Sequence, residues 1–148
     1  MSAEILVSRF RSFLLVTAGL CCVASVLELW LEEHTGSLPQ SIPFYLCRLG
    51  AAAIVFALIR PQRVTLKLLR YVMGAMLVGS LFGLIEHVEH NWEFAREIRP
   101  NATFQVLLSD TLHGANPLLA PGILAIAAAL AIAATYYHPS LTGTKAAD

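Results

Sequence analysis

Charged residues are scarce in this chain of 148 residues, of which 14% are charged and 57% are hydrophobic. A water-soluble domain usually carries about 25% charged residues, and the mean hydropathy here is +0.66. Glycine is also sparse, with nine residues, which together with the apolar content excludes a collagen-like chain and intrinsic disorder. The composition therefore predicts an integral membrane protein whose first partner is the lipid bilayer.

Several motifs that carry chemistry are absent. The sequence has no Cys-x-x-Cys pair, no Gly-rich phosphate loop, and no G-x-S-x-G or H-E-x-x-H motif, which disfavours the enzyme classes built on them. Basic stretches with interleaved aromatic residues are lacking, so no nucleic-acid partner is expected. The cysteines Cys21, Cys22 and Cys47 fall within apolar runs, where buried packing is their expected role. These absences leave open whether the chain is an enzyme.

Four apolar runs are long enough to cross a membrane. A bilayer core of about 30 Å needs roughly 20 helical residues, and the runs cover about residues 13–31, 42–59, 68–88 and 118–137. They predict an all-α, integral membrane four-helix bundle, with residues 1–148 forming one domain. No A-x-A cleavage site follows the first run, so we interpret it as a retained helix rather than a signal peptide.

Charges of opposite sign are expected at opposite ends of these spans. Seven of the ten basic residues fall on one side: Arg9, Arg11, Arg60, Arg63, Lys67, Arg70 and Lys145. Since basic residues mark the cytoplasmic side, we expect a multi-pass protein of the cell (inner) membrane with both termini in the cytoplasm. The acidic loops then face outward.

The second and fourth spans share a proline frame. Pro43 and Pro121 are expected to begin these spans, and Pro61 and Pro139 follow their ends, 18 residues later in both cases. The pattern predicts two duplicated helical hairpins, as in other membrane folds with internal repeats. The alternative is that any two hydrophobic hairpins look alike.

Two further features concern packing. Ala75, Gly79 and Gly83 recur every four residues, a spacing that lets helix backbones approach closely. In the outer loop between the third and fourth spans, Phe104–His113 is predicted to form a short helix that lies in the membrane interface while Asp110 faces water.

Acidic and histidine side chains gather in the outward-facing half. His87 and His90 are three residues apart, as are Asp110 and His113, so each pair shares a helix face. Imidazoles and carboxylates that converge from several elements suit a divalent metal such as Zn, Mn or Fe. The candidate ligands are Glu86, His87, Glu89, His90, Asp110 and His113, with Glu28, Glu32 or His34 from the first hairpin. The alternative is a solvated helix end. Haem is disfavoured because no second histidine lies inside a span at the depth of His87.

Arg48 lies several residues inside the second span. An unpaired charge is unfavourable there, so we expect an intramembrane ion pair of Arg48 with Glu28 or Glu86. Snorkelling of the long side chain to the outer headgroups is the alternative.

Together these patterns favour a small polytopic membrane protein whose outward-facing Glu/His/Asp cluster binds a divalent transition metal. Two alternatives come from other classes. One is a non-catalytic accessory subunit, present as a homodimer or in a larger membrane complex. The other is a proton- or ion-coupled transporter.

Overall fold

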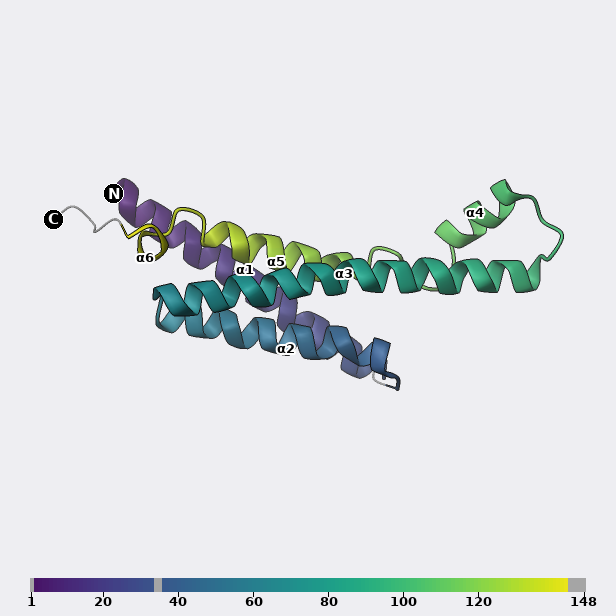
Figure 1. Cartoon of the computed structure of the whole chain (residues 1–148), viewed down its shortest axis with the longest axis horizontal. Coiled ribbons are helices and arrows are strands. Elements are labelled where there is room, and N and C mark those ends of the chain that lie inside the picture. Colours follow the sequence, from purple (N-terminus) through teal and green to yellow (C-terminus); the bar gives the residue numbers. More distant parts are fainter. Residues whose placement is uncertain (1, 34–35, 144–148) are drawn as a thin grey trace.

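The chain is all-helical in the part that the structure, a computed structural model, describes, which is residues 2–33 and 36–143. Its helices are α1 (Ala3–Leu31), α2 (Leu38–Ile59), α3 (Arg63–Ile98), α4 (Phe104–Leu112), α5 (Gly122–Ala134) and α6 (Pro139–Thr142) (Figure 1). The predicted all-α class is confirmed. Two residues used above, His34 and Lys145, lie outside the described residues.

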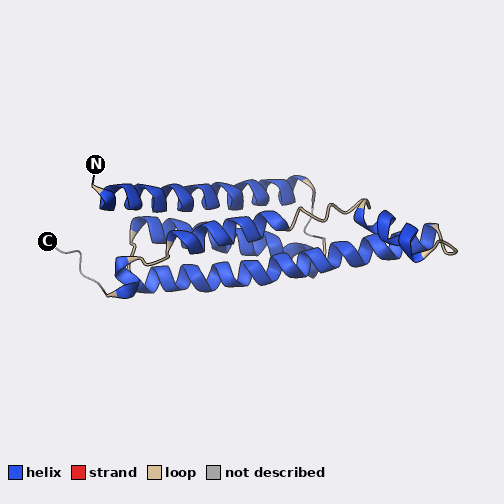
Figure 2. Cartoon of the chain, turned by 90° about the horizontal axis from the view of Figure 1, so that it is seen from above, coloured by secondary structure: helices blue, strands red, loops and turns tan. Residues whose placement is uncertain are grey.

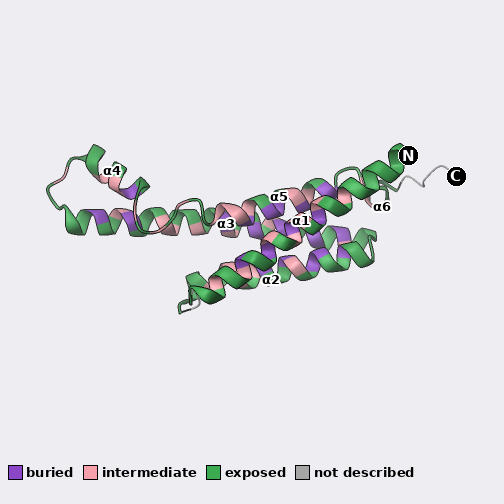
Figure 3. Ribbon diagram, turned by 180° about the vertical axis from the view of Figure 1, so that it is seen from behind, coloured by how far each residue is buried: buried purple, intermediate pink, exposed green. Residues whose placement is uncertain are grey.

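Four of the helices pack around a common core. Helix α1 packs against α2 and α5, and α3 packs against the same two helices, whereas α2 and α5 meet only briefly. The N-terminus, α6 and the α2–α3 connection lie at one end of the bundle, and α3 continues far beyond its other end (Figures 1 and 2). The core is built from small, aliphatic and sulfur-containing side chains, and the buried parts of the ribbon lie where α1, α2, α3 and α5 pack together (Figure 3).

Three helices, α1, α2 and α3, are long and apolar enough to cross a membrane. Helix α5 is apolar but has 13 residues, a length of about 20 Å. The bundle therefore contains three helices that qualify as spans and a fourth that is shorter than the hydrocarbon core of a bilayer, which measures about 30 Å.

The helix ends differ from the predicted spans because hydropathy marks only the apolar part of a helix. Helix α1 begins ten residues before the predicted start, where the Ser2 side chain accepts a hydrogen bond from the Ile5 amide at 3.5 Å. Helix α3 has 36 residues, and its N-terminus carries a capping box formed by Gln62 and Thr65. Its other end runs on through Glu- and Arg-rich sequence, which favours helix although it is polar.

The proline frame holds at one span only. Pro121 is the N-cap of α5, as expected, but Pro43 lies inside α2, which begins at Leu38. The prediction that Pro43 begins its span is therefore wrong. Proline is tolerated there because only one backbone hydrogen bond, near the helix start, is lost. The two hairpins thus differ in both helix length and proline position.

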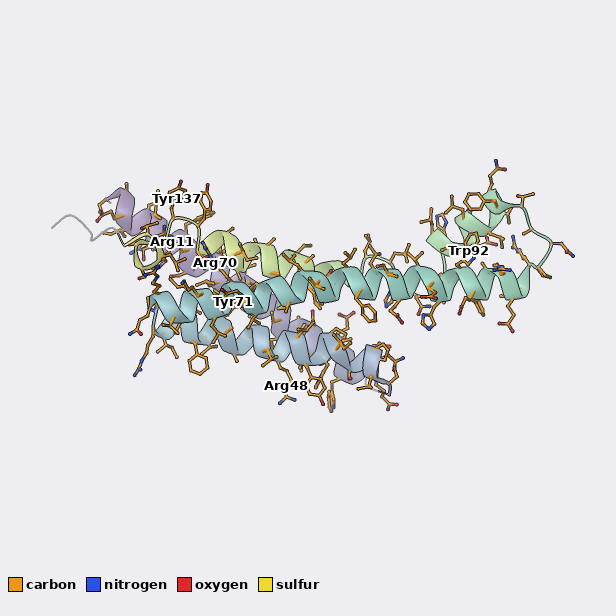
Figure 4. The ribbon with its side chains drawn as sticks, in the orientation of Figure 1. Arg11, Arg48, Arg70, Tyr71, Trp92 and Tyr137 are labelled. Carbon is orange, nitrogen blue, oxygen red and sulfur yellow. The ribbon has the colours of Figure 1, made fainter. Side chains whose placement is uncertain are left out.

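Two arginines hold the C-terminal end of α5. Arg70 of α3 donates to the Thr135 hydroxyl at 2.8 Å and to its carbonyl at 3.0 Å. Arg11 of α1 donates to the carbonyls of Tyr136 and Tyr137, at 3.2 and 3.1 Å. Arg11, Arg70 and Tyr137 are labelled near one another in Figure 4. Positive charge at a helix C-terminus also offsets the helix dipole. These contacts fix the C-terminal end of α5 against α1 and α3.

The predicted close-packing stripe divides between two neighbours. A Cβ placed on Gly79 would collide with Leu46 of α2, and one placed on Gly83 would lie 3.3 Å from Pro121. Ala75, the third member, is exposed on the bundle surface. Glycine at these two positions therefore lets α2 and the start of α5 approach α3.

Candidate functional site

The outer hairpin, residues 86–121, is the part of the molecule that sequence analysis marked for function. It consists of the outer end of α3, helix α4 and the connection from α4 to α5. The last thirteen residues of α3 extend about 20 Å past Ile85, and α4 folds back against them (Figure 1). The expected helix over residues 104–113 is confirmed, since α4 spans Phe104–Leu112. It packs on α3, whereas its predicted place in the membrane interface stays a prediction.

Asn91 locks this hairpin together. Its side chain is buried in α3, and its Nδ2 donates to the carbonyls of Thr111 at 3.0 Å and Asn116 at 2.8 Å. Its Oδ1 accepts hydrogen bonds from the backbone amide and the side-chain amide of Asn116, at 3.0 and 3.1 Å. Every donor and acceptor of the buried amide is therefore used, which makes its partners hard to exchange.

Gly114 allows this close approach. A Cβ on Gly114 would overlap the side-chain amide of Asn91, with Oδ1 at 2.6 Å and Nδ2 at 2.7 Å. Any other residue would push the connection away from α3. Only glycine therefore fits at this position without a steric clash, and the sequence alone does not indicate this requirement.

Two more side chains of α3 bind the same connection. The Ser80 hydroxyl donates to the Pro121 carbonyl at 2.7 Å, and Nδ1 of His87 donates to the Pro117 carbonyl at 2.9 Å. With Asn91, these residues form a line along one face of α3 at steps of seven and four. Sequence reasoning followed this face through Gly79, Gly83 and His87 and missed Asn91, which the same four-residue step predicts.

The tip of the hairpin is held more weakly. Arg99 and Asp110 form an ion pair at 3.3 Å, with the arginine side chain largely exposed. The rings of Trp92 and Phe104 lie 5.8 Å apart between centroids. Exposed ion pairs contribute about 0–1 kcal/mol, so the buried amide network is the main tertiary link of the hairpin.

The candidate metal ligands are distributed over several faces. Asp110 is paired with Arg99, and no group of three or more His, Cys, Asp or Glu side chains converges in residues 2–33 and 36–143. The three histidines share one feature, since Nδ1 of each donates to a backbone carbonyl. The acceptors are Pro117 for His87, Glu86 for His90 at 2.7 Å, and Ser109 for His113 at 2.8 Å. In a neutral ring, this hydrogen bond leaves Nε2 as the acceptor nitrogen.

A shallow hollow of about 300 Å³ lies between α3 and the connection. His90, Glu93 and Glu97 of α3 border it together with Asn116. A second hollow on the other side of Glu93 and Glu97 is bordered by Arg96 and Pro100. Glu93 and Glu97 therefore border two solvent-accessible hollows.

Arg48 does not form the expected ion pair. Glu28 and Arg48 are both exposed. In residues 2–33 and 36–143, Arg48 forms no ion pair with Glu28 or with Glu86. The Arg48 guanidinium instead lies over the Phe44 ring of its own helix, 5.5 Å from the ring centroid, and points away from the bundle (Figure 4). This orientation fits the snorkelling alternative, in which the charge reaches the headgroups.

Comparison of the chain with protein-family models, with curated proteins and with solved structures found no match. The class of the protein is therefore defined by its own fold, a small all-helical protein with three helices suited to cross a membrane and a hydrogen-bonded helical extension.

Proposed function

We propose that the chain is a non-catalytic accessory subunit of a larger membrane complex and that its outer hairpin binds the partner. The proposal rests on the outer part of α3, which extends past the other helices of the bundle. Asn91 holds the α4–α5 connection against this part, and its surface exposes apolar side chains. Phe94 and Ile98 are both more than half exposed there. Apolar side chains exposed to water in this way are typical of a binding surface.

The charges of the same surface indicate the kind of partner. Glu89, Glu93 and Glu97 are exposed on the outer part of α3, where they outnumber the two exposed arginines, Arg96 and Arg99. A partner with an apolar surface and a basic rim would match this combination, because complementary charge guides association and fixes its register. We therefore propose a membrane protein whose outward-facing part carries such a surface.

The membrane placement belongs to the same proposal. We propose an inner-membrane protein with both termini in the cytoplasm and the outer hairpin outside. The α2–α3 connection, which carries Arg60 and Arg63, lies at the end that holds the N-terminus and α6 (Figure 1), and its basic residues support this orientation.

Solubilisation of native membranes in mild detergent tests the proposal. The tagged chain is expected to migrate in a complex with a partner at fixed stoichiometry, and a Phe94→Ser/Ile98→Ser variant is expected to lose the partner. A matched Val78→Ser/Leu81→Ser variant changes two exposed apolar residues of α3 at the level of the bundle, away from the outer hairpin. This variant should keep the partner. A wild-type chain that runs alone, or equal retention by both variants, would refute the proposal.

A second candidate function is the binding of a divalent metal, Zn, Mn or Fe. It is favoured by the histidine geometry, because metal-bound histidines commonly donate their other ring N–H to a backbone carbonyl. Glu86, Glu89 and Asp110 are the carboxylates near these rings in sequence, and ligation requires rotamer changes that bring them to the Nε2 atoms.

Elemental analysis of the purified chain tests this candidate against a His87→Ala/His90→Ala/His113→Ala variant. About one metal ion per chain, absent from the folded variant, is expected if the cluster is a site. No metal in the wild type after loading would leave the outer cluster as a solvated helix end.

A further inference from the structure

Three cations follow one face of α3 where the helix leaves the α2–α3 connection. Arg63, Lys67 and Arg70 are spaced at steps of four and three residues, which places their side chains on one face of a helix. All three are exposed, and they extend over about 10 Å along the helix axis. We call these three residues the basic stripe.

No acidic residue of the same helices neutralises the basic stripe. The sequence contains no Asp or Glu between Glu33 and Glu86, so α2 and the part of α3 up to Ile85 carry no negative side chain. In residues 2–33 and 36–143, the side chains of Arg63 and Lys67 form no hydrogen bond and no ion pair. These two cations are therefore available to an anion from outside the chain.

Arg70 gives the basic stripe a fixed end. Its guanidinium donates to the hydroxyl and the carbonyl of Thr135, at 2.8 and 3.0 Å, which uses two of its five N–H donors. The hydroxyl of Ser140 in α6 donates to the Pro61 carbonyl at 2.7 Å and holds the α2–α3 connection against α6. The stripe therefore borders a corner that hydrogen bonds hold in place, and Arg70 keeps donors for a further acceptor.

An apolar stripe accompanies the basic one. Val64, Leu68 and Tyr71 each follow a member of the basic stripe by one residue, and their exposed fractions are 75%, 51% and 77%. Successive residues of a helix are about 100° apart, so the two stripes lie side by side on α3. Arg70 and Tyr71 are labelled on this part of the helix in Figure 4. Cations beside exposed apolar side chains match an anion that carries acyl chains.

We propose that this surface of α3 binds one anionic diacyl phospholipid of the surrounding bilayer. The phosphate lies between Lys67 and Arg70, and Arg63 attracts the headgroup from one turn closer to the α2–α3 connection. The acyl chains lie along the apolar stripe. The site is independent of the partner of the outer hairpin. Only the choice of leaflet rests on the proposed orientation, in which the cytoplasmic leaflet supplies the anionic lipid.

Charge decides which lipid the basic stripe prefers. A phosphatidylglycerol headgroup carries a net negative charge, whereas phosphatidylcholine adds a quaternary ammonium that cancels the charge of the phosphate. Lysine and arginine donate charge-assisted hydrogen bonds to phosphate oxygens, and each basic residue near a membrane surface adds to the attraction of anionic lipid. The stripe should therefore prefer phosphatidylglycerol, and the preference should weaken as salt is added.

Titration of the purified full-length chain in a nonionic detergent tests the proposal, with bound lipid counted by native mass spectrometry. Phosphatidylglycerol and phosphatidylcholine with identical acyl chains are the probes. The wild type is expected to bind a single phosphatidylglycerol at least about tenfold more tightly than phosphatidylcholine. An Arg63→Gln/Lys67→Gln variant is expected to lose this preference. Neither side chain has a partner in the part of the chain that the structure describes, so the variant should keep its helical circular dichroism and its thermal stability in detergent.

Arg96→Gln/Arg99→Gln is the matched control, because it removes the same charge from exposed positions at the other end of α3. This variant should keep the preference for phosphatidylglycerol. Equal affinity of the wild type for the two lipids, or an equal loss in the two double variants, would overturn the proposal. Inorganic phosphate in millimolar excess should not displace the lipid, because it lacks acyl chains. Displacement would assign the basic stripe to free phosphate and would also overturn the proposal.

Discussion

The side chain of Asn91 and the backbone of Asn116 are paired as two amides. Nδ2 of Asn91 donates to the Asn116 carbonyl at 2.8 Å, and its Oδ1 accepts from the Asn116 amide at 3.0 Å. The two residues are 25 positions apart in the sequence. The side-chain amide of Asn91 therefore pairs with a backbone segment in the way that a neighbouring backbone would. This pairing fixes the connection between α4 and α5 onto α3.

Replacement of Asn91 is expected to open the outer hairpin without unfolding the bundle. Asn91→Ala removes four hydrogen bonds and leaves the buried Thr111 carbonyl and the half-buried backbone of Asn116 without their partner, which costs about 2–3 kcal/mol. Amide hydrogen exchange over residues 104–116 should accelerate, whereas exchange in α1 and α2 should not change. Asn101→Ala, at an exposed position of the hairpin tip, is the control. Unchanged protection in Asn91→Ala would contradict this account.

Gly114→Ala is expected to have a similar effect, since the new methyl group would overlap the Asn91 amide. Because both changes break the same contact, the double variant should be little worse than either single one. Gly74→Ala provides the opposite control, because nothing lies within 4 Å of a Cβ there. Alanine favours the helix interior, so Gly74→Ala should stabilise α3 by up to about 1 kcal/mol. Additive effects of Asn91→Ala and Gly114→Ala would argue against a shared contact.

Loss of the Arg70 guanidinium is expected to destabilise the bundle. Arg70→Met keeps an apolar stem but removes the hydrogen bonds to Thr135, and bonds from a charged donor contribute about 1.5–3 kcal/mol each at most. We expect a loss of about 2 kcal/mol in the free energy of unfolding, measured by denaturation in mixed micelles. Lys67→Met, which changes an exposed cation one turn earlier, should have little effect. A comparable loss in Lys67→Met would mean that general charge, rather than the contact with Thr135, is responsible.

Stability is expected to fall at mildly acidic pH because of His138. Burial and the nearby positive charge of Arg11 lower the pKa of His138 below its ordinary value of 6.5. The folded chain therefore disfavours the protonated ring, and Nδ1 accepts a hydrogen bond from the Ser140 amide at 3.2 Å only when it is unprotonated. The stabilisation is complete above pH 6.5 and decreases as the pH falls toward the lower pKa of the folded state.

The measurement is the midpoint of thermal unfolding between neutral and mildly acidic pH. His138→Asn keeps a side chain that caps α6 but does not titrate, so it should remove this part of the pH dependence. An identical pH profile in His138→Asn and the wild type would show that other groups are responsible.

Hydropathy and local helix propensity predict the apolar and locally capped parts of this fold, but not the parts that depend on contacts between distant residues. The apolar parts of α1, α2 and α3 and the position of α4 were accessible from sequence, because lipid-facing length and capping are local properties. The outer end of α3 was underestimated, since outside the membrane only weak helix propensity marks a helix. The shortness of α5 follows from Pro117 and Pro121, which delay its start.

The candidate sites were less accessible because they depend on how helices rotate against one another. The predicted ion pair of Arg48 with Glu28 or Glu86 assumed that these residues lie at a similar depth in the membrane. Depth alone does not decide the direction in which a side chain points around its helix. The packing of Cys22 and Met76 against Gly50 likewise depends on how α1, α2 and α3 are rotated relative to one another. Each of these residues taken alone had packing as its most reasonable role.

The shortness of α5 has a consequence for the surrounding lipid. Because α5 has only 13 residues, about 10 Å of a bilayer core must be covered by the non-helical segment that precedes Gly122. In this segment the carbonyls of Pro117 and Pro121 accept hydrogen bonds from His87 and Ser80. This side of the protein therefore presents a hydrophobic mismatch that the other helices do not share. Lipids next to α5 are expected to thin the bilayer locally, and proteins with similarly short spans share that thinner annulus at lower free energy. Membrane thickness would then influence where this protein resides and which neighbours it meets.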